Sequence, residues 1–318
     1  MPHSIAALGI THSPLKGAVD PAPEVVREHD LALAEAAAWV RDFDPELVVV
    51  FGPDHYRGFF YDLMPSWCIG IAAVGLGDWY SPRGPVKVPA DIAGACVAHL
   101  QAAGFDPAFS HHMKVDHGIT QPLGWLDIGL DQRPVLPIFI NCVATPMPSY
   151  ARVRAFGAAV GQFVASLDQR VLVIGSGGLS HDPPVPQLST AAPETRQRIV
   201  HRRDISAEDE RAMRERVVGA TRDFLAGNSR MLPPNEAWDH AFLSSLGHGR
   251  LHQTDSLGEG LEKVAGCGGH ETRTWVAAFA ALERAAGPYA LDTLYYRCVP
   301  EWLTGMGIVR GIPESMTG

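Results

Sequence analysis

The sequence predicts an α/β fold, and three observations support this. Apolar, β-branched segments alternate with longer helical patterns through the first half of the chain, which is typical of βαβ units and a largely parallel sheet. One of these segments, Leu47–Phe51, is continuously apolar, as expected of a strand covered by helices on both faces. Apolar residues make up 46% and charged residues 19% of the 318 residues, which is ordinary for a globular protein that folds on its own.

The first elements are predicted from the order of apolar runs and helix signals. Ser4–Ile10 is expected to form the first strand. Pro23–Phe43 should be a helix, because proline stands at its start and Glu24 lies near the positive end of the helix dipole. Leu47–Phe51 follows as a strand that ends at a Gly-Pro pair. Further strands are expected over Cys68–Val74, Val135–Ile140 and Val171–Ile174, and further helices over Ala90–Ala103 and Tyr150–Leu167.

The second half contains a segment of different composition. Asp182–Ile205 is rich in proline and then strongly charged, so we expect an exposed excursion from the core. Ser206 followed three residues later by Asp209 is a variant of the capping box, which predicts a helix that runs to about Leu225. Its packing face would carry Met213, Val217, Thr221 and Phe224. With no repeat, low-complexity tract or clear linker in the sequence, residues 1–318 are interpreted as a single domain with insertions.

The charge and the apolar runs exclude several classes of partner. A formal net charge of -9 repels phosphate backbones and anionic lipid, so neither nucleic acid nor a membrane is expected as a partner. No apolar run reaches the ~20 residues of a membrane span, and the N-terminal segment lacks the pattern of a signal peptide. Five scattered cysteines without a C-x-x-C pair indicate free thiols in a reducing compartment. We therefore expect a cytoplasmic protein that acts on a small molecule.

Three histidines follow predicted strands directly. They are His12 in THSP, His55 in PDHY and His181 in GSGGLSHDPP. Ligand sites of open α/β sheets gather beyond the carboxyl ends of the strands, so these side chains are expected on one rim of the sheet. The glycine-rich turn before His181 could let the backbone approach a ligand closely. It matches neither the dinucleotide nor the phosphate-loop pattern, so no nucleotide is expected.

Other candidates lie in separate segments. His117 stands beside Asp116 in KVDHGITQP, and His270 and Glu271 stand at the expected start of a helix in HETRTWVAAFAALERA. Two histidines and a carboxylate suit non-haem iron(II), because they leave coordination positions for substrate and oxygen. Spacing alone does not identify such a triad, and a lone histidine more often has a structural or surface role. That ordinary role is our interpretation of His99, His201, His248 and His252.

Six longer segments carry a family resemblance. They are THSPLKGAVDPAPEVV, PELVVVFGPDHYRGFFYDLMPSWCIG, VDHGITQPL, RPVLPIFINCVATPMPSY, RVLVIGSGGLSHDPPVP and HETRTWVAAFAA. Together they closely resemble the LigB-type (class III) extradiol dioxygenases. The resemblance runs nearly end to end, reaches YYRCVPEWLTGMG, and is weakest between about Ala191 and Asp209. It implies one α/β domain with a central mixed sheet between helical layers, and assembly as a homo-oligomer.

The resemblance also implies roles for individual residues. His12 and His55 match the family's two iron-ligating histidines, Glu271 its carboxylate ligand, His117 its proton donor and His181 its proton acceptor. The implied reaction inserts both atoms of O2 into a 3-substituted catechol and gives a 2-hydroxy-6-oxo-dienedioate. The implied substrate is 2,3-dihydroxyphenylpropionate, the corresponding cinnamate or another such catechol. The implied cofactor is Fe2+, for which manganese could substitute.

Several assignments around these residues stay open. Glu259, Glu262 and Glu283 are acids near Glu271 in the sequence, and Glu271 could simply favour the dipole of a first helical turn. Asp116 and Asp182 could orient the neighbouring histidine rings or could be solvated. Four aromatic residues near His55 could wall a ring-shaped substrate, although aromatic residues more often fill the core. They are Phe59, Phe60, Tyr61 and Trp67.

Two other functions compete with the dioxygenase. A zinc-dependent hydrolase on the same scaffold is one, because two histidines and a carboxylate also hold zinc. A non-catalytic binding protein is the other, because fold does not imply function. Both are less favoured, because His117 and His181 each match a position with a defined task in ring cleavage. The sequence identifies no cationic partner for the carboxylate of the substrate side chain.

Overall fold

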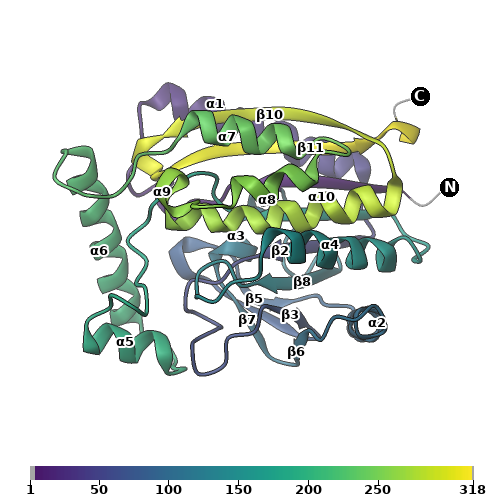
Figure 1. Ribbon diagram of the computed structural model, residues 1–318, viewed down its shortest axis with the longest axis horizontal. Helices are drawn as coiled ribbons and strands as arrows, with labels where there is room; N and C mark the ends of the chain where they lie inside the picture. Colours follow the sequence, from purple (N-terminus) through teal and green to yellow (C-terminus); the bar gives the residue numbers. More distant parts are fainter. Residues whose placement is uncertain (1–3, 317–318) are drawn as a thin grey trace.

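A large mixed β-sheet forms the centre of the computed structural model, which describes residues 4–316. Its eight strands lie in the order β10-β11-β1-β9-β2-β8-β3-β6 (Figure 1). β1, β9, β2 and β8 are parallel neighbours, whereas β11 joins β1 and β3 joins β8 antiparallel. The strands are β1 (Ile5–Ile10), β2 (Leu47–Gly52), β3 (Trp67–Gly70), β6 (Ala108–Ser110), β8 (Val135–Ile140), β9 (Val171–Ser176), β10 (Tyr289–Val299) and β11 (Thr304–Pro313).

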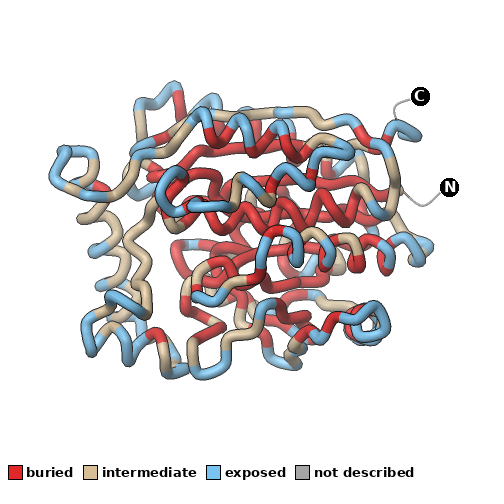
Figure 2. Tube along the Cα trace, in the orientation of Figure 1, coloured by how far each residue is buried: buried red, intermediate tan, exposed pale blue. Residues whose placement is uncertain are grey.

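The central strands are buried on both faces, which explains their continuous apolar runs. Ala7, Val49 and Val173 belong to one hydrophobic cluster, and the residues that follow each of them in the chain belong to another, as the twofold period of a strand requires. The first cluster includes α2 (Ala90–Ala102), α4 (Tyr150–Val164) and α10 (Thr272–Ala286), and the second includes α1 (Pro23–Phe43) and α3 (His117–Trp125). Most buried residues therefore lie in the sheet and in α10 (Figure 2).

The prediction of an α/β chain with these main elements is confirmed, with two corrections in the sheet. The segment predicted as one strand over Cys68–Val74 forms two strands, because the chain turns after Gly70. β3 stays in the large sheet, while β4 (Ala73–Leu76) joins a small sheet in the order β5-β4-β7, with β5 (Arg83–Val86) and β7 (Met113–Val115). The large sheet is mixed, as the family resemblance implies, whereas the alternation of strand and helix patterns suggested a largely parallel sheet; the C-terminal hairpin β10–β11 extends it antiparallel to β1.

The excursion predicted over Asp182–Ile205 is only partly exposed. It contains α5 (Pro193–Val200), and Ile199 on this helix is buried in a cluster that includes Phe60. α6 (Ala207–Leu225) follows, with the capping box between Ser206 and Asp209 that the sequence predicts. α5 and α6 lie to one side of the sheet and its helical layers (Figure 1). The charged residues between the few apolar ones conceal how far this segment packs against the body.

Several shorter helical segments precede α10 in the chain. They include α7 (Glu236–Ser245), α8 (Thr254–Leu257), α9 (Glu262–Ala265) and the 3-10 turn η3 (Cys267–Glu271) that leads into α10. Within residues 4–316, no helix combines the length and the apolar character that a membrane crossing requires.

Helices α4 and α10 pack closely because two glycines of α4 face the backbone of α10. A Cβ atom on Gly157 would meet the backbone of Ala277, and one on Gly161 would meet the backbone of Ala281. We expect Gly161→Ala to lower the free energy of unfolding by about 1–3 kcal/mol in urea titrations, because the helices would have to separate. Gly94→Ala in α2, where the added methyl meets open space, is the matched control and should be neutral or stabilising. Equal effects of the two substitutions would contradict this account.

A buried carboxyl group on α7 links stability to pH. Burial raises the pKa of Asp239 to about 6, although hydrogen bonds from Ser180 N and the Tyr296 hydroxyl favour its ionised form. Because the folded pKa lies above the ~3.9 of an unfolded aspartate, protonation stabilises the fold below pH 4, and this contribution is lost as the pH rises through 6. Between pH 4 and 8, we expect the wild type to lose about 2 kcal/mol of unfolding free energy relative to Asp239→Asn. If the unfolding free energies of the two proteins changed with pH in parallel, this role of Asp239 would be refuted.

Candidate active site

The three strand-end histidines lie together at one rim of the sheet, as the sequence predicts. His12, His55 and His181 follow β1, β2 and β9, and these strands are neighbours in the order β1-β9-β2. Their parallel direction brings all three carboxyl ends to the same edge. His117, at the first position of α3, joins them, with its ring centroid 5.4 Å from that of His12 and 4.5 Å from that of His55.

The Nδ1 atoms of His12 and His55 are held by hydrogen bonds from outside the site. Ser176, which pairs with Ile10 across β9 and β1, donates its hydroxyl proton to Gly118 O and therefore accepts a proton from His12 Nδ1 at 3.0 Å. His55 Nδ1 lies 2.9 Å from Asp116 Oδ2, which also accepts the backbone N–H of His55. With its proton on Nδ1, the neutral His12 ring presents the lone pair of Nε2 to the centre of the site. Burial lowers the pKa of His55, but Asp116 and Glu271 outweigh it and hold that pKa well above its usual value, so the free ring carries a second proton on Nε2, which a bound metal would displace.

A different aspartate orients His117 from the one considered in the sequence. His117 Nδ1 lies 2.6 Å from Asp78 Oδ2, and Asp78 Oδ1 accepts the backbone N–H of His117 at 2.8 Å. Asp78 opens the short 3-10 turn η1 (Asp78–Tyr80) and is buried. Asp116 instead caps α3 through the N–H of Gly118 and orients His55. Adjacency in the sequence was misleading here, because Asp116 points toward the neighbouring loop.

His181 is oriented by a backbone carbonyl. Its Nδ1 donates to Leu179 O at 2.8 Å, so the neutral ring carries its lone pair on Nε2. The neighbouring Asp182 does not orient the ring, because its carboxylate accepts the backbone N–H groups of Leu232 and Cys267. A side chain at Gly178 would overlap the His181 ring. The glycine-rich turn thus makes room for a side chain of the site itself, whereas the sequence suggested close approach to a ligand.

Glu271 brings a carboxylate to the centre of the histidines. Its Oε2 lies 3.5 Å from His12 Nε2, and its Oε1 lies 3.2 Å from His55 Nε2 and 3.3 Å from His181 Nε2. Gly178 N donates to Oε2 at 2.9 Å. Glu271 ends η3 directly before α10, and this end of α10 is fixed to the end of β9 by the hydrogen bonds of Thr274 to Ser176 O and Trp275 to Gly177 O. Glu271 is therefore far more than a residue of a first helical turn.

Burial and mutual charge set the protonation of these groups. Burial lowers the pKa of His12 to about 3, against the opposing effect of Glu271, so its ring is neutral. Burial raises the pKa of Glu271, but the histidines, His181 first, outweigh it and hold the pKa well below its usual value. Burial lowers the pKa of His181, yet the charge of Glu271 leaves that pKa above its usual value. Glu271 is thus a buried carboxylate that makes His181 a stronger base.

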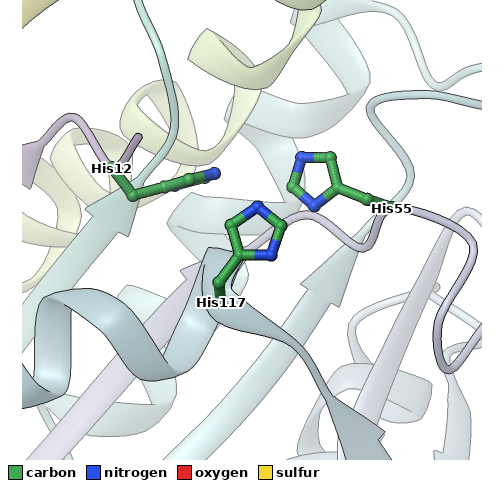
Figure 3. A group of neighbouring side chains, drawn as sticks. All are labelled: His12, His55 and His117. Carbon is green, nitrogen blue, oxygen red and sulfur yellow. The ribbon is translucent and has the colours of Figure 1, made fainter. Parts of the chain in front are cut away.

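Two sets of donors for a metal ion face the centre of the site, and a third group is formed by Asp78, Asp116 and His117, whose aspartates already hold histidine rings. The Nε2 and Nδ1 atoms of His12, His55 and His117 include one from each ring within 4.8 Å of the others, and Figure 3 shows the three rings facing one another. His12 and His55 together with Glu271 form the second set. Imidazole nitrogens, present in both sets, and the carboxylate of the second set are ligands that divalent transition metals prefer. The residues therefore fit a catalytic metal.

The other acids near Glu271 lie outside this group. Glu262 contacts His270 at 3.1 Å, and Glu283 lies 3.7 Å from His248. His270 also contacts the guanidinium of Arg273 and does not line the cavity, although the sequence made it a candidate. Glu259 is exposed. Of the acids considered for the carboxylate position, Glu271 alone among the described residues contacts the clustered histidines.

A cavity of about 200 Å³ opens onto the histidines, below the ~300–1,000 Å³ of most ligand pockets and therefore suited to a small substrate. Its walls are formed by loops after the strands on one side and by α5 and α6 on the other. Of the aromatic residues near His55, Phe60 lines the cavity, whereas Phe59 stacks on Phe139 and Trp67 stacks on Phe156 in the core. The sequence could not separate these roles, because the segment folds back on itself.

Two residues that position the site were missed in the sequence. Asp78 lies in a short turn without a recognisable motif, and its link to His117 exists only because β4 and β7 pair. Ser176 is the last residue of β9 and looks there like the end of an apolar strand. Its place opposite Ile10, two residues before His12, is set by the register of β1 and β9 and becomes evident only in the structure.

The comparisons with known proteins agree with the geometry. A family model described as the catalytic LigB subunit of aromatic ring-opening dioxygenase matches residues 6–307. A protein of Paraburkholderia xenovorans is 49% identical over 97% of this chain and 98% of its own length, and one of Cupriavidus pinatubonensis is 47% identical over 96% and 98%. Both are named 2,3-dihydroxyphenylpropionate/2,3-dihydroxicinnamic acid 1,2-dioxygenase.

A solved structure extends the comparison to the fold alone. The crystal structure of an uncharacterised protein from Escherichia coli K12 matches with a TM-score of 0.52 over 96% of this chain and 98% of its own, at 15% identity. The match of the family model over almost the whole chain, and the relatives at nearly half identity, decide the family. The chain belongs to the LigB family of aromatic ring-opening dioxygenases.

Proposed function

We propose that this protein is an iron(II)-dependent extradiol dioxygenase that cleaves a catechol with a short acid side chain, with 2,3-dihydroxyphenylpropionate or the corresponding cinnamate as substrate. The observation that carries the proposal is the convergence of Glu271 and the Nε2 atoms of His12 and His55 at the mouth of strands β1, β9 and β2. The names of the relatives support the choice of substrate.

We infer that His12, His55 and Glu271 hold the metal and leave His117 free for proton transfer. Glu271 supports this choice over a third imidazole, because its carboxylate contacts the Nε2 atoms of both His12 and His55. Bound iron(II) would supply the one-electron chemistry that lets dioxygen react with an aromatic ring. The alternative set, in which His117 replaces Glu271, would leave the site without a proton donor on that side.

The other two histidines then carry the protons. His181 Nε2 has the lone pair in the neutral ring, and Glu271 raises the pKa of this histidine, so it can accept a proton from a catechol hydroxyl. The resulting imidazolium is stabilised by the carboxylate of Glu271 at 3.3 Å. His117, fixed at Nδ1 by Asp78, presents Nε2 to the cavity, and in its imidazolium form it can donate the proton on Nε2 to an oxygen of the opening ring.

Iron binding and oxygen uptake test the ligand set and the reaction together. Anaerobically loaded wild type should retain one iron and consume one O2 per added 2,3-dihydroxyphenylpropionate, with a yellow product. We expect His12→Ala and Glu271→Ala to lose the iron, and His117→Ala to keep the iron but lose activity. Iron retained by Glu271→Ala but lost by His117→Ala would show that the three histidines hold the metal.

The same experiment distinguishes the competing functions. A zinc-dependent hydrolase would bind zinc and show no oxygen uptake with any catechol when it is loaded with iron(II). A non-catalytic binding protein would bind the catechol without consuming oxygen. Either result would reject the proposal.

Asp78 provides a test of the proton donor. We expect Asp78→Asn to lower kcat by about 10–100-fold with little change in KM, and to shift the acid limb of the pH–rate profile, because His117 loses its fixed orientation and tautomer. Asp182→Asn is the control, because Asp182 adjoins His181 in sequence but its carboxylate accepts the backbone N–H groups of Leu232 and Cys267 and does not hold the ring. An unchanged profile of Asp78→Asn, or an equal loss in Asp182→Asn, would contradict this role.

A further inference from the structure

Four arginines line the cavity, although the chain as a whole is acidic. Arg57 lies two residues after His55, in the loop that follows β2. Arg198 lies on α5, Arg216 lies on α6, and Arg203 lies between these two helices. Only two carboxylates line the same cavity, those of Asp209 and Glu271. The carboxylate of Glu271 already contacts three histidine rings. The end of the cavity formed by α5 and α6 is therefore positively charged, against a net charge of -9 for the chain.

Two of these arginines have acidic partners. Arg203 Nη1 lies 3.0 Å from Asp209 Oδ2, and Arg57 Nη1 lies 2.8 Å from Glu210 Oε2. Arg57 still has capacity for a ligand, because its side chain is only 2% exposed while its Nε and Nη2 atoms have no hydrogen-bond partner among the described residues. Buried N–H groups are costly to leave unpaired, and in a guanidinium they are strong donors to a carboxylate.

The other two arginines have no acidic partner within residues 4–316. Neither Arg198 nor Arg216 forms an ion pair or a side-chain hydrogen bond there. Burial lowers the pKa of Arg216, and the charges of Arg198 and Arg57 lower that pKa further, so the three guanidinium groups repel one another. An anion placed among them would remove this repulsion.

Helix α6 turns Arg216 toward the cavity, and most of its neighbours on that face are apolar, apart from Asp209 in the first turn. Ala212, Met213 and Val217 line the cavity beside it, at the spacing of one helical face. Ile199 on α5 and Phe60 add further apolar wall. Beyond Arg57, a ligand would therefore lie between hydrocarbon side chains on its way to the guanidinium groups of Arg198 and Arg216.

We propose that Arg57, Arg198 and Arg216 bind the carboxylate of the substrate side chain while the catechol ring lies among the histidines. This inference rests on the proposed function and names the residues that select an acid side chain. Planar guanidinium groups bind carboxylates through paired hydrogen bonds, so a cluster of three favours an acid over a neutral chain of the same length.

The distance between the two ends fits a short side chain. Asp78, which holds His117 at 2.6 Å, also lies 3.8 Å from Nε of Arg57. A single aspartate thus lies between the guanidinium and the proton donor. Arg57 therefore lies close to the histidine end of the cavity, which favours an acid on a short side chain.

A pair of substrates that differ only in the charge tests the assignment. We expect Arg216→Gln to raise KM for 2,3-dihydroxyphenylpropionate by about 10–100-fold with kcat nearly unchanged, the loss of one charged hydrogen-bonding group. For 3-propylcatechol, which lacks the carboxylate, kcat and KM should stay within about twofold. Arg198→Gln should give the same pattern. An equal loss with both substrates, or no change with the acid, would overturn the proposal.

Arg211→Gln is the matched control on the same helix. Arg211 lies on the opposite face of α6, in a separate surface hollow with Tyr80 and Arg214. Arg211→Gln removes the same charge as Arg216→Gln, but Arg211 does not line the cavity. KM for both catechols should therefore stay as in the wild type. If KM for the acid rises as much as in Arg216→Gln, the effect comes from the net charge of the protein and not from a contact in the cavity. That result would overturn the proposal.

Binding without turnover separates this inference from the proposed reaction. We expect calorimetry to show that 3-phenylpropionate, which has the acid chain but no hydroxyls, binds wild type at least tenfold more tightly than Arg216→Gln. If wild type cleaves 3-propylcatechol but does not favour the acid, the reaction stands and the arginine site is wrong. If wild type cleaves neither catechol but binds 3-phenylpropionate through Arg216, the reaction is wrong and the arginine site stands.

Discussion

The site depends on one buried charge, the carboxylate of Glu271. A carboxylate that is 2% exposed is stable only if donors or positive charge surround it. Here the N–H of Gly178 donates to it, and the rings of His55 and His181, whose pKa values lie above their usual value, can donate from Nε2 when they are protonated. The histidines come from three different strand ends, so the sheet must be assembled before the carboxylate can be satisfied. Removal of Glu271 would leave the histidines without the group that fixes their protonation, and removal of a histidine would leave a poorly paired buried charge.

The four histidine rings of the site are all held in the same manner, at Nδ1. His12, His55, His117 and His181 are each held at Nδ1 by a serine, an aspartate or a carbonyl, which leaves Nε2 of every ring toward the cavity. These partners belong to the body of the sheet and its loops rather than to α5 and α6. The ring orientations are therefore set by the fold and need no ligand to establish them.

The sequence predicted the strands that carry the site better than it predicted the groups that orient it. His12, His55 and His181 were placed on one rim because parallel strands end together, and this needs only the order of the elements. The partner of His117 could not be found in this way, because Asp78 reaches it through the pairing of β4 with β7. The C-terminal hairpin was missed for a similar reason, since β10 alternates half-buried and exposed residues and lacks a continuous apolar run. Charged residues hid the packing of α5 and α6 against the cavity.

The location of α5 and α6 separates two tasks that many enzymes combine in one set of residues. The groups proposed for metal binding and proton transfer belong to the sheet with its helical layers, where most substitutions disturb the core, whereas much of the far wall belongs to two helices at its side. Residues on these helices can change in size and charge at a small cost in stability. Related chains could thus diverge toward catechols with other substituents by altering one short insertion, while the ring-opening chemistry stays as it is.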